Sequence, residues 1–151
     1  MSHTPSDIVA ELLKGSGLPF TDPDDQDAWP LFTSFMPDGP RVPDNAGCVT
    51  DTTGVRHARR FDTGGMAVSY GIQVSIRSTT AAAGYEKALE VQSLMSAVHQ
   101  QAVVIGSDEY AVQTCSQTSP ILPLGQERTS ETGSSLTKRR SLFTLNFLVM
   151  L

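Results

Sequence analysis

Cysteine is scarce in this sequence, and long apolar runs are missing. The 151 residues include only two cysteines, Cys48 and Cys115, which lie far apart in the chain. Because the first residues are polar and do not resemble a secretion signal, we expect both thiols to be reduced and partly buried in a reducing cytoplasm. No apolar run approaches the length that spans a membrane, so we expect no membrane partner.

The local motifs of common active sites are also missing. The sequence contains no Gly-x-Ser-x-Gly elbow, no phosphate-binding Walker loop and no Gly-x-Gly-x-x-Gly turn. Its histidines, His3, His57 and His99, have no histidine or cysteine three or four residues away, a spacing that is typical of zinc sites. We therefore expect no catalytic residue, no cofactor and no metal ion, and we predict that the protein is not an enzyme.

An excess of basic residues, the usual footprint of nucleic-acid binding, is missing as well. The net charge is −5, and residues 1–30 account for all of it with six acidic residues and one lysine. The stretch from Asp22 to Asp27 is similar to a calcium loop in composition only. Counted from Asp22, the glycine and glutamate positions of an EF-hand are occupied by Asp27 and Thr33. A solvated acidic segment is the better interpretation.

What the sequence does contain is two regular alternations of apolar and polar side chains. From Met66 to Arg77 the even-numbered positions are apolar, and from Leu142 to Leu151 the odd-numbered positions are apolar. Successive side chains of a strand point to opposite faces of the sheet, so each run predicts a half-buried strand. The second strand ends the sequence, and we expect no further module after it.

Helices are predicted on either side of the first alternation. Thr4, Pro5 and Asp7 are typical of a helix start, and this helix is expected to end at the glycines of residues 15–17. A longer helix is predicted from about residue 81 to residue 100, with apolar residues at helical spacing. Weaker patterns, with residues 51–54 as the turn of a hairpin, predict short strands over 29–35, 47–50, 55–61, 103–105 and 109–115.

Together these elements predict one α+β domain over residues 1–151. It divides into an N-terminal helix (1–17), a segment of proline-rich strands and loops (18–65) and a strand-helix-hairpin-strand core (66–151). Within the core, residues 126–138 are polar and are expected to form a long loop. We predict a mostly antiparallel sheet with one long helix packed on a face and a short N-terminal helix.

Two groups of basic residues predict electrostatic contacts, in which one copy of the chain meets the acidic segment of another copy. The alternative is that these arginines are solvated surface side chains. The candidate subunit-interface charges are Arg56, Arg59, Arg60, Arg139 and Arg140 on the basic side, and Asp22, Asp24, Asp25 and Asp27 on the acidic side.

A series of short motifs runs through the second half of the chain. They are, in order, Tyr70-Gly71-Ile72-Gln73-Val74-Ser75-Ile76-Arg77, a helix with Tyr85, Ala88 and Leu94, then Glu109-Tyr110-Ala111-Val112, Pro123-Leu124-Gly125, an arginine pair, and Phe143-Thr144-Leu145-Asn146-Phe147-Leu148-Val149. Over residues 66–151 this order resembles the tail terminator proteins of long-tailed bacteriophages, also called tail completion or minor capsid proteins. In that family a strand ending in arginine precedes the helix, and a Pro-Leu-Gly element precedes the last strand.

The resemblance implies an α+β subunit of a homohexameric ring. Such a ring sits on the last ring of the tail tube protein, stops tube polymerisation and offers a docking surface to the head-completion or neck protein. Viral DNA passes through the lumen of the ring without specific binding. The resemblance therefore also implies a virion protein at the tail–neck junction, assembled in the cytoplasm of the host bacterium.

The polar stretch before the last strand is longer here than in the family that the chain resembles. Loops of this length often order on a partner, so we expect this one to face the tube or the head. Its candidate partner-facing residues are Gln126, Glu127, Arg128, Glu131 and Lys138.

Two other functions fit the sequence. A head-closure or head–tail joining protein also forms rings in the phage neck. A small cytoplasmic enzyme or ligand-binding domain is the more distant alternative, and it would need polar residues buried near Trp29, Tyr70 and Tyr110.

Overall fold

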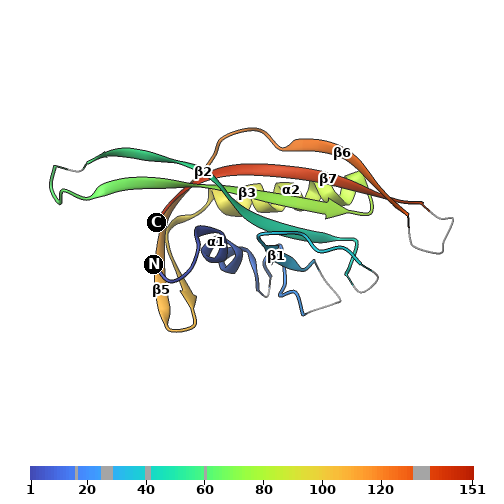
Figure 1. Cartoon of the computed structure of the whole chain (residues 1–151), viewed down its shortest axis with the longest axis horizontal. Helices are drawn as coiled ribbons and strands as arrows, with labels where there is room; N and C mark the ends of the chain where they lie inside the picture. Colours follow the sequence, from blue (N-terminus) through green and yellow to red (C-terminus); the bar gives the residue numbers. More distant parts are fainter. Residues whose placement is uncertain (16, 25–28, 40–41, 60, 131–136) are drawn as a thin grey trace.

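Seven strands form one curled, half-barrel sheet, and two short helices pack against it (Figure 1). The computed structural model describes residues 1–15, 17–24, 29–39, 42–59, 61–130 and 137–151. In chain order the elements are α1 (Pro5–Leu13), β1 (Leu31–Thr33), β2 (Ala46–Arg59), β3 (Met66–Ser78), α2 (Ala81–Ser96), β4 (His99–Ile105), β5 (Asp108–Gln117), β6 (Leu122–Ser130) and β7 (Thr137–Met150).

The central strand of the sheet is β7, which carries two different strands along one edge. The strand order is β1-β2-β3-β7-β5-β4, and β6 also pairs with β7. Strand β6 pairs with the first part of β7, from Ser130↔Thr137 to Leu122↔Thr144, and β5 pairs with its last part, from Gln117↔Phe147 onward. Only the β1–β2 pair is parallel among the described strand pairs.

Both helices begin where the sequence places them, and each has a side-chain cap. At α1 the Thr4 hydroxyl accepts from the Asp7 amide (3.2 Å), and the Asp7 carboxylate accepts from the Thr4 amide (3.0 Å), which is a capping box. At α2 the Thr80 hydroxyl accepts from the Ala83 amide. Helix α2 ends at Ser96, several residues before the predicted end. Neither helix of the described chain has the length and apolar character needed to cross a bilayer.

The hydrophobic core lies between the inner face of the sheet and the two helices. Both alternations are confirmed where the two strands pair, because the apolar positions of β3 from Ile72 to Ile76 and of β7 from Phe143 to Val149 are buried in the core with the helices. Their register places Val74 opposite Leu145 and Ile72 opposite Phe147. The core side chains of the two strands and of α2 with almost no exposed surface are Ile72, Val74, Ile76, Leu145, Phe147, Val149, Ala88, Val91 and Met95.

The predicted fold class is wrong, because the protein is mostly β rather than α+β with one long helix. Strands hold 52% of the chain, and both helices are short. Part of the difference comes from residues 51–54 and 99–100, which belong to β2 and β4, and part from residues 126–138, which were expected to form a loop. Residues 126–130 belong to β6 and 137–138 to β7, which pair as an antiparallel ribbon, while 131–136 lie outside the described residues. A ribbon that is polar on both faces has no alternation to reveal it.

Strand β2 also runs through the turn that the sequence predicts at residues 51–54. The ladder shifts its register between Thr52 and Val55, which marks a β-bulge. A Cβ added to Gly54 would lie 2.4 Å from the Ser69 carbonyl oxygen, and one added to Gly71 would lie 2.3 Å from that of Thr53. The two glycines therefore allow two backbones to approach closely, and the chain reverses further along, between β2 and β3.

Candidate functional site

The outer half of the β2–β3 hairpin projects from the body of the protein (Figure 1). Strand β3 pairs with β7 only from Ser69 onward, and β1 covers only residues 47–49 of β2. Beyond these points neither strand has a further strand partner among the described residues. We call this two-stranded ribbon the arm, and it comprises residues 51–59 and 61–68.

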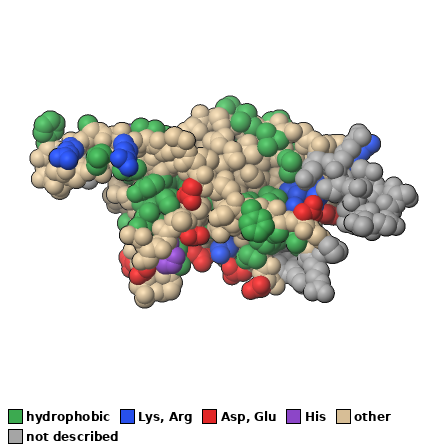
Figure 2. Space-filling view, in the orientation of Figure 1, with side chains coloured by type: hydrophobic (Ala, Val, Ile, Leu, Met, Phe, Trp, Pro, Cys, Tyr) green, Lys and Arg blue, Asp and Glu red, His purple; other side chains and the backbone are tan. Residues whose placement is uncertain are grey.

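The arm combines exposed apolar side chains with exposed arginines. Phe61 is fully exposed, and the side chains of Val55 and Met66 are about half exposed. Arg56 and Arg59 lie on the same ribbon, and neither forms an ion pair with a described acidic residue of its own chain. Figure 2 shows basic and apolar side chains together at this projecting end of the molecule. This mixture is typical of a surface that a partner covers.

The base of the arm is tied to α1, and its ladder carries one internal side-chain contact. Asp51 accepts hydrogen bonds from the Ser6 amide (3.0 Å) and the Ser6 hydroxyl (2.7 Å). Further out, His57 Nε2 lies 2.8 Å from the Ser69 hydroxyl across the ribbon. These contacts fix where the arm leaves the body.

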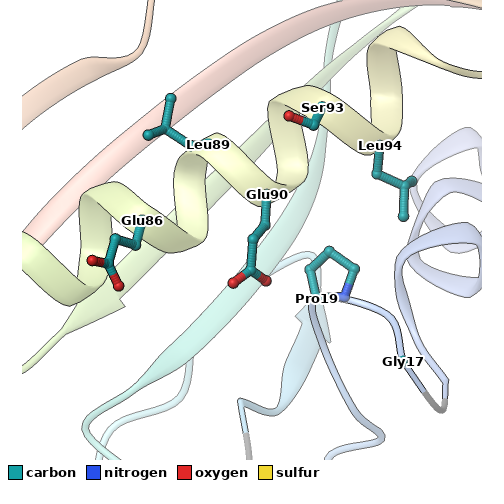
Figure 3. Close-up of a pocket in the computed structure, with 7 residues that line it drawn as sticks. All are labelled: Gly17, Pro19, Glu86, Leu89, Glu90, Ser93 and Leu94. Carbon is teal, nitrogen blue, oxygen red and sulfur yellow. The ribbon is translucent and has the colours of Figure 1, made fainter.

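A hollow of about 620 Å³ lies on the outer side of α2, between this helix and the segment that follows α1 (Figure 3). Apolar side chains and carboxylates share its lining. The residues that line the hollow are Gly17, Pro19, Glu86, Leu89, Glu90, Ser93 and Leu94.

A mostly buried lysine lies beside this hollow. The Lys87 ammonium donates to the Pro19 carbonyl oxygen (2.9 Å) and to the Glu90 carboxylate (2.9 Å), and it lies 5.2 Å from the centre of the Trp29 ring. Glu90 is therefore partly neutralised. Glu86 is exposed and forms no ion pair with a described residue, so it contributes a full negative charge to the hollow.

The acidic residues predicted for a subunit contact lie in different situations. The Asp22 carboxylate is 3.1 Å from the Lys14 ammonium, in an exposed ion pair that contributes little stability. Asp24 is exposed. Asp25 and Asp27 lie outside the described residues. The structure therefore places Asp22 and Asp24 on the surface, and their role in a contact between copies stays a prediction.

The predicted basic residues also differ in their surroundings, and one of them, Arg140, forms an ion pair within its own chain. Arg139 is exposed, and Arg60 lies outside the described residues. Arg140 is 2% exposed, and its two terminal nitrogens donate to both oxygens of Asp38 (3.0 and 2.9 Å). The hydrogen bonds from Arg140 lower the pKa of Asp38 to about 2, although partial burial of the carboxyl works in the opposite direction.

A second buried arginine, Arg77, was not among the predicted site residues. It is 3% exposed. Its Nε, Nη1 and Nη2 atoms donate to the carbonyl oxygens of Asp44 (3.1 Å), Pro37 (3.1 Å) and Pro43 (2.9 Å). With Arg140 it fixes part of the proline-rich segment, residues 36–39 and 42–45, against the sheet, and we call this part the strap. An arginine that ends an apolar strand was the signal in the sequence.

Four of the predicted partner-facing residues belong to the β6–β7 ribbon. Gln126 is exposed on β6. The backbones of Glu127 and Arg128 belong to β6 and that of Lys138 to β7, whereas Glu131 lies outside the described residues. Their contact with a tube or a head stays a prediction.

The described residues offer little chemistry for a reaction. They contain no group of three or more His, Cys, Asp or Glu side chains that could hold a metal ion. Burial raises the pKa of Cys48 and of Cys115 to about 11, so both thiols are protonated and weakly nucleophilic at neutral pH. Neither belongs to a disulfide.

The aromatic residues proposed for a ligand pocket, Trp29, Tyr70 and Tyr110, line none of three hollows that the described residues form, namely the one beside α2 and two smaller ones. Trp29 packs against Phe20 and Lys87, and the Tyr110 hydroxyl lies 2.9 Å from His3 Nδ1.

Comparison with known proteins adds no family to this geometry. No protein-family model matches the chain, and no curated protein matches it.

Proposed function

We propose that this protein is a structural subunit that assembles with copies of itself into a ring, and that the ring is the tail terminator of a long-tailed bacteriophage. The arm is the observation that carries self-assembly. A two-stranded ribbon is marginally stable on its own in water, and Val55, Phe61 and Met66 gain nothing by exposure in an isolated chain. A partner that covers them accounts for both features.

In this proposal the arm contacts a different surface of the next copy, which gives a ring rather than a symmetric pair. The arm lies at one end of the molecule, away from the helices and the hollow (Figure 1). A contact between the arm and a different surface of the next copy is heterologous, and such contacts close into rings when the rotation between subunits divides a full circle.

The tail assignment rests on the resemblance of residues 66–151 to tail terminator proteins. In this proposal a hexameric ring sits on the last ring of the tail tube protein, ends tube growth and presents its other face to the head-completion or neck protein. The protein has a structural role and no enzymatic one. It is assembled in the host bacterial cytoplasm and belongs to the virion at the tail–neck junction, where DNA crosses the ring without specific binding.

Electron microscopy of a lysate from a phage that lacks this gene tests the tail assignment. We expect overlong tails without heads beside DNA-filled heads, because nothing stops tube growth. Tails of normal length beside emptied heads would contradict the terminator and would assign the protein to head closure. Complementation with the wild-type gene is the control, and it should restore tails of one length.

A further inference from the structure

We infer that the arm of one copy docks in the hollow beside α2 of the next copy. This inference rests on the proposed self-assembly and names the two surfaces that make the contact. It commits to a second copy of this chain as the occupant of the hollow, because the apolar and charged groups of the two surfaces are complementary.

The apolar groups of the two surfaces match in kind. The arm offers Phe61 and Met66, which are exposed, and the lining of the hollow includes Pro19, the exposed Leu89 and the half-buried Leu94. The hollow, of about 620 Å³, is open to solvent, so it can cover one side of an incoming apolar group without enclosing it. Phe61 is the most exposed large apolar side chain of the arm, so it is the expected anchor.

The charges of the two surfaces have opposite signs. Arg56 and Arg59 are exposed on the arm, and Glu86 and Glu90 line the hollow. Glu90 already contacts Lys87, so Glu86 is the expected main partner of an incoming arginine. Exposed charges of this kind set orientation and association rate more than affinity. The apolar contacts should therefore supply the affinity, and the charges should select the register.

The hollow does not take the arm of its own chain. No arm residue lines it, and residues 51–59 are exposed throughout. Because the two surfaces lie on different parts of one subunit, each copy can offer its arm to one neighbour and its hollow to the other. This is the head-to-tail arrangement that a closed ring requires.

Engineered cysteines test the contact directly. A chain with Thr63→Cys, an exposed arm position that leaves Phe61 in place, and Ser93→Cys should form disulfide-linked oligomers under mild oxidation at pH 8, seen as a ladder on a non-reducing gel. Cys48 and Cys115 should stay out of the exchange, because their raised pKa keeps them protonated there. The matched control pairs Thr63→Cys with Ser107→Cys, in the exposed β4–β5 turn, and it should give no ladder.

Side-chain changes test the energetics by analytical ultracentrifugation. Phe61→Ser should raise the dissociation constant between copies about tenfold or more. Val104→Ser removes an equally apolar, exposed side chain from β4 and should leave it unchanged. Arg56→Glu with Arg59→Glu should weaken assembly at low salt and much less at 1 M salt. Adding Glu86→Arg to that chain should restore part of the loss, whereas adding Glu109→Arg on β5 should not.

The outcomes separate this inference from the proposed function. The arm-in-hollow contact is supported if the chain with Ser93→Cys forms the ladder, the control with Ser107→Cys does not, and Phe61→Ser loses assembly. If the wild-type chain forms oligomers, Phe61→Ser still forms them and the chain with Ser93→Cys gives no ladder, then the contact is wrong and self-assembly remains supported. A wild-type chain that is monomeric at every concentration overturns self-assembly and this inference with it.

Discussion

The inner and outer halves of the β2–β3 hairpin share one ladder but have different surroundings. In the inner half, Val49 pairs with Val74, and both are fully buried under the helices. In the outer half, residues 51–59 are exposed, and no described element covers the arm. Both halves have the same backbone pairing, so this pairing does not determine which half is stabilised by the core and which is accessible to a partner. Burial against α1 and α2 stabilises the inner half, and the outer half is left for a partner.

A truncation in the inner half should give the largest effect. Ile76→Ala removes a fully buried side chain of β3, so we expect the free energy of unfolding to fall by about 2–5 kcal/mol. Urea denaturation followed by circular dichroism measures it. A matched change in the outer half, Val55→Ala, should cost less than about 0.5 kcal/mol. Equal losses in the two variants would remove the distinction between the halves.

Arg77 follows Ile76 in β3, and a change at Arg77 tests the opposite face of this strand. Arg77→Met keeps a long, unbranched side chain at this position but removes three hydrogen bonds to strap carbonyls. Buried acceptors that lose a charged donor are costly, and we expect a loss of about 2–3 kcal/mol in the same denaturation experiment. Susceptibility of the strap to limited proteolysis should rise as well. Unchanged stability and cleavage would show that the strap is held by other contacts.

The Asp38–Arg140 pair should make strap attachment sensitive to acid. The pKa of Asp38 in the folded protein, about 2, lies below its usual value, so the pair contributes stability above pH 4 that is lost as the pH falls from about 4 to 2. Asp38 is half exposed, so solvent screening limits this contribution to below about 1 kcal/mol. The stability difference between wild type and Asp38→Asn should therefore shrink over this range. A constant difference would contradict the linkage.

The smallest effect on stability should come from the tip of the arm. Phe61→Ser replaces a fully exposed side chain, and we expect the unfolding free energy of the dissociated chain to change by less than about 0.5 kcal/mol. The measurement is denaturation at a concentration where wild type is monomeric. A large loss would mean that Phe61 packs within its own chain, and the arm would then belong to the body.

The parts of the fold that the sequence could predict are those with a one-sided burial pattern. The strands around Ile76 and Leu145 alternate cleanly because one face meets the helices, and Thr4 marks α1 by its own side-chain chemistry. Strand β6 escapes this logic, since its polar sequence has no alternation. The two strands of the arm were predicted over 55–61 and from Met66, but the turn was placed at 51–54, whereas the chain reverses between β2 and β3. This predicted turn was wrong because a tight turn and a close approach of two backbones both favour glycine, and Gly54 serves the close approach.

The candidate site was predictable only in part. Arg56 and Arg59 could be identified as surface charges, because a run of basic side chains is seldom buried. The ion pair of Arg140 could not be predicted, since its partner Asp38 lies 102 residues away and only the folded chain brings them together. The hollow beside α2 is likewise built from segments that are distant in sequence, so no local pattern marks it.

The central position of β7 has a consequence for how the chain folds during synthesis. This strand follows every other described strand in the sequence, yet β3, β5 and β6 all depend on it for pairing. A nascent chain therefore holds three unfinished edges until β7 leaves the ribosome. Long-range pairing of this kind folds slowly and exposes strand edges to aggregation in the meantime.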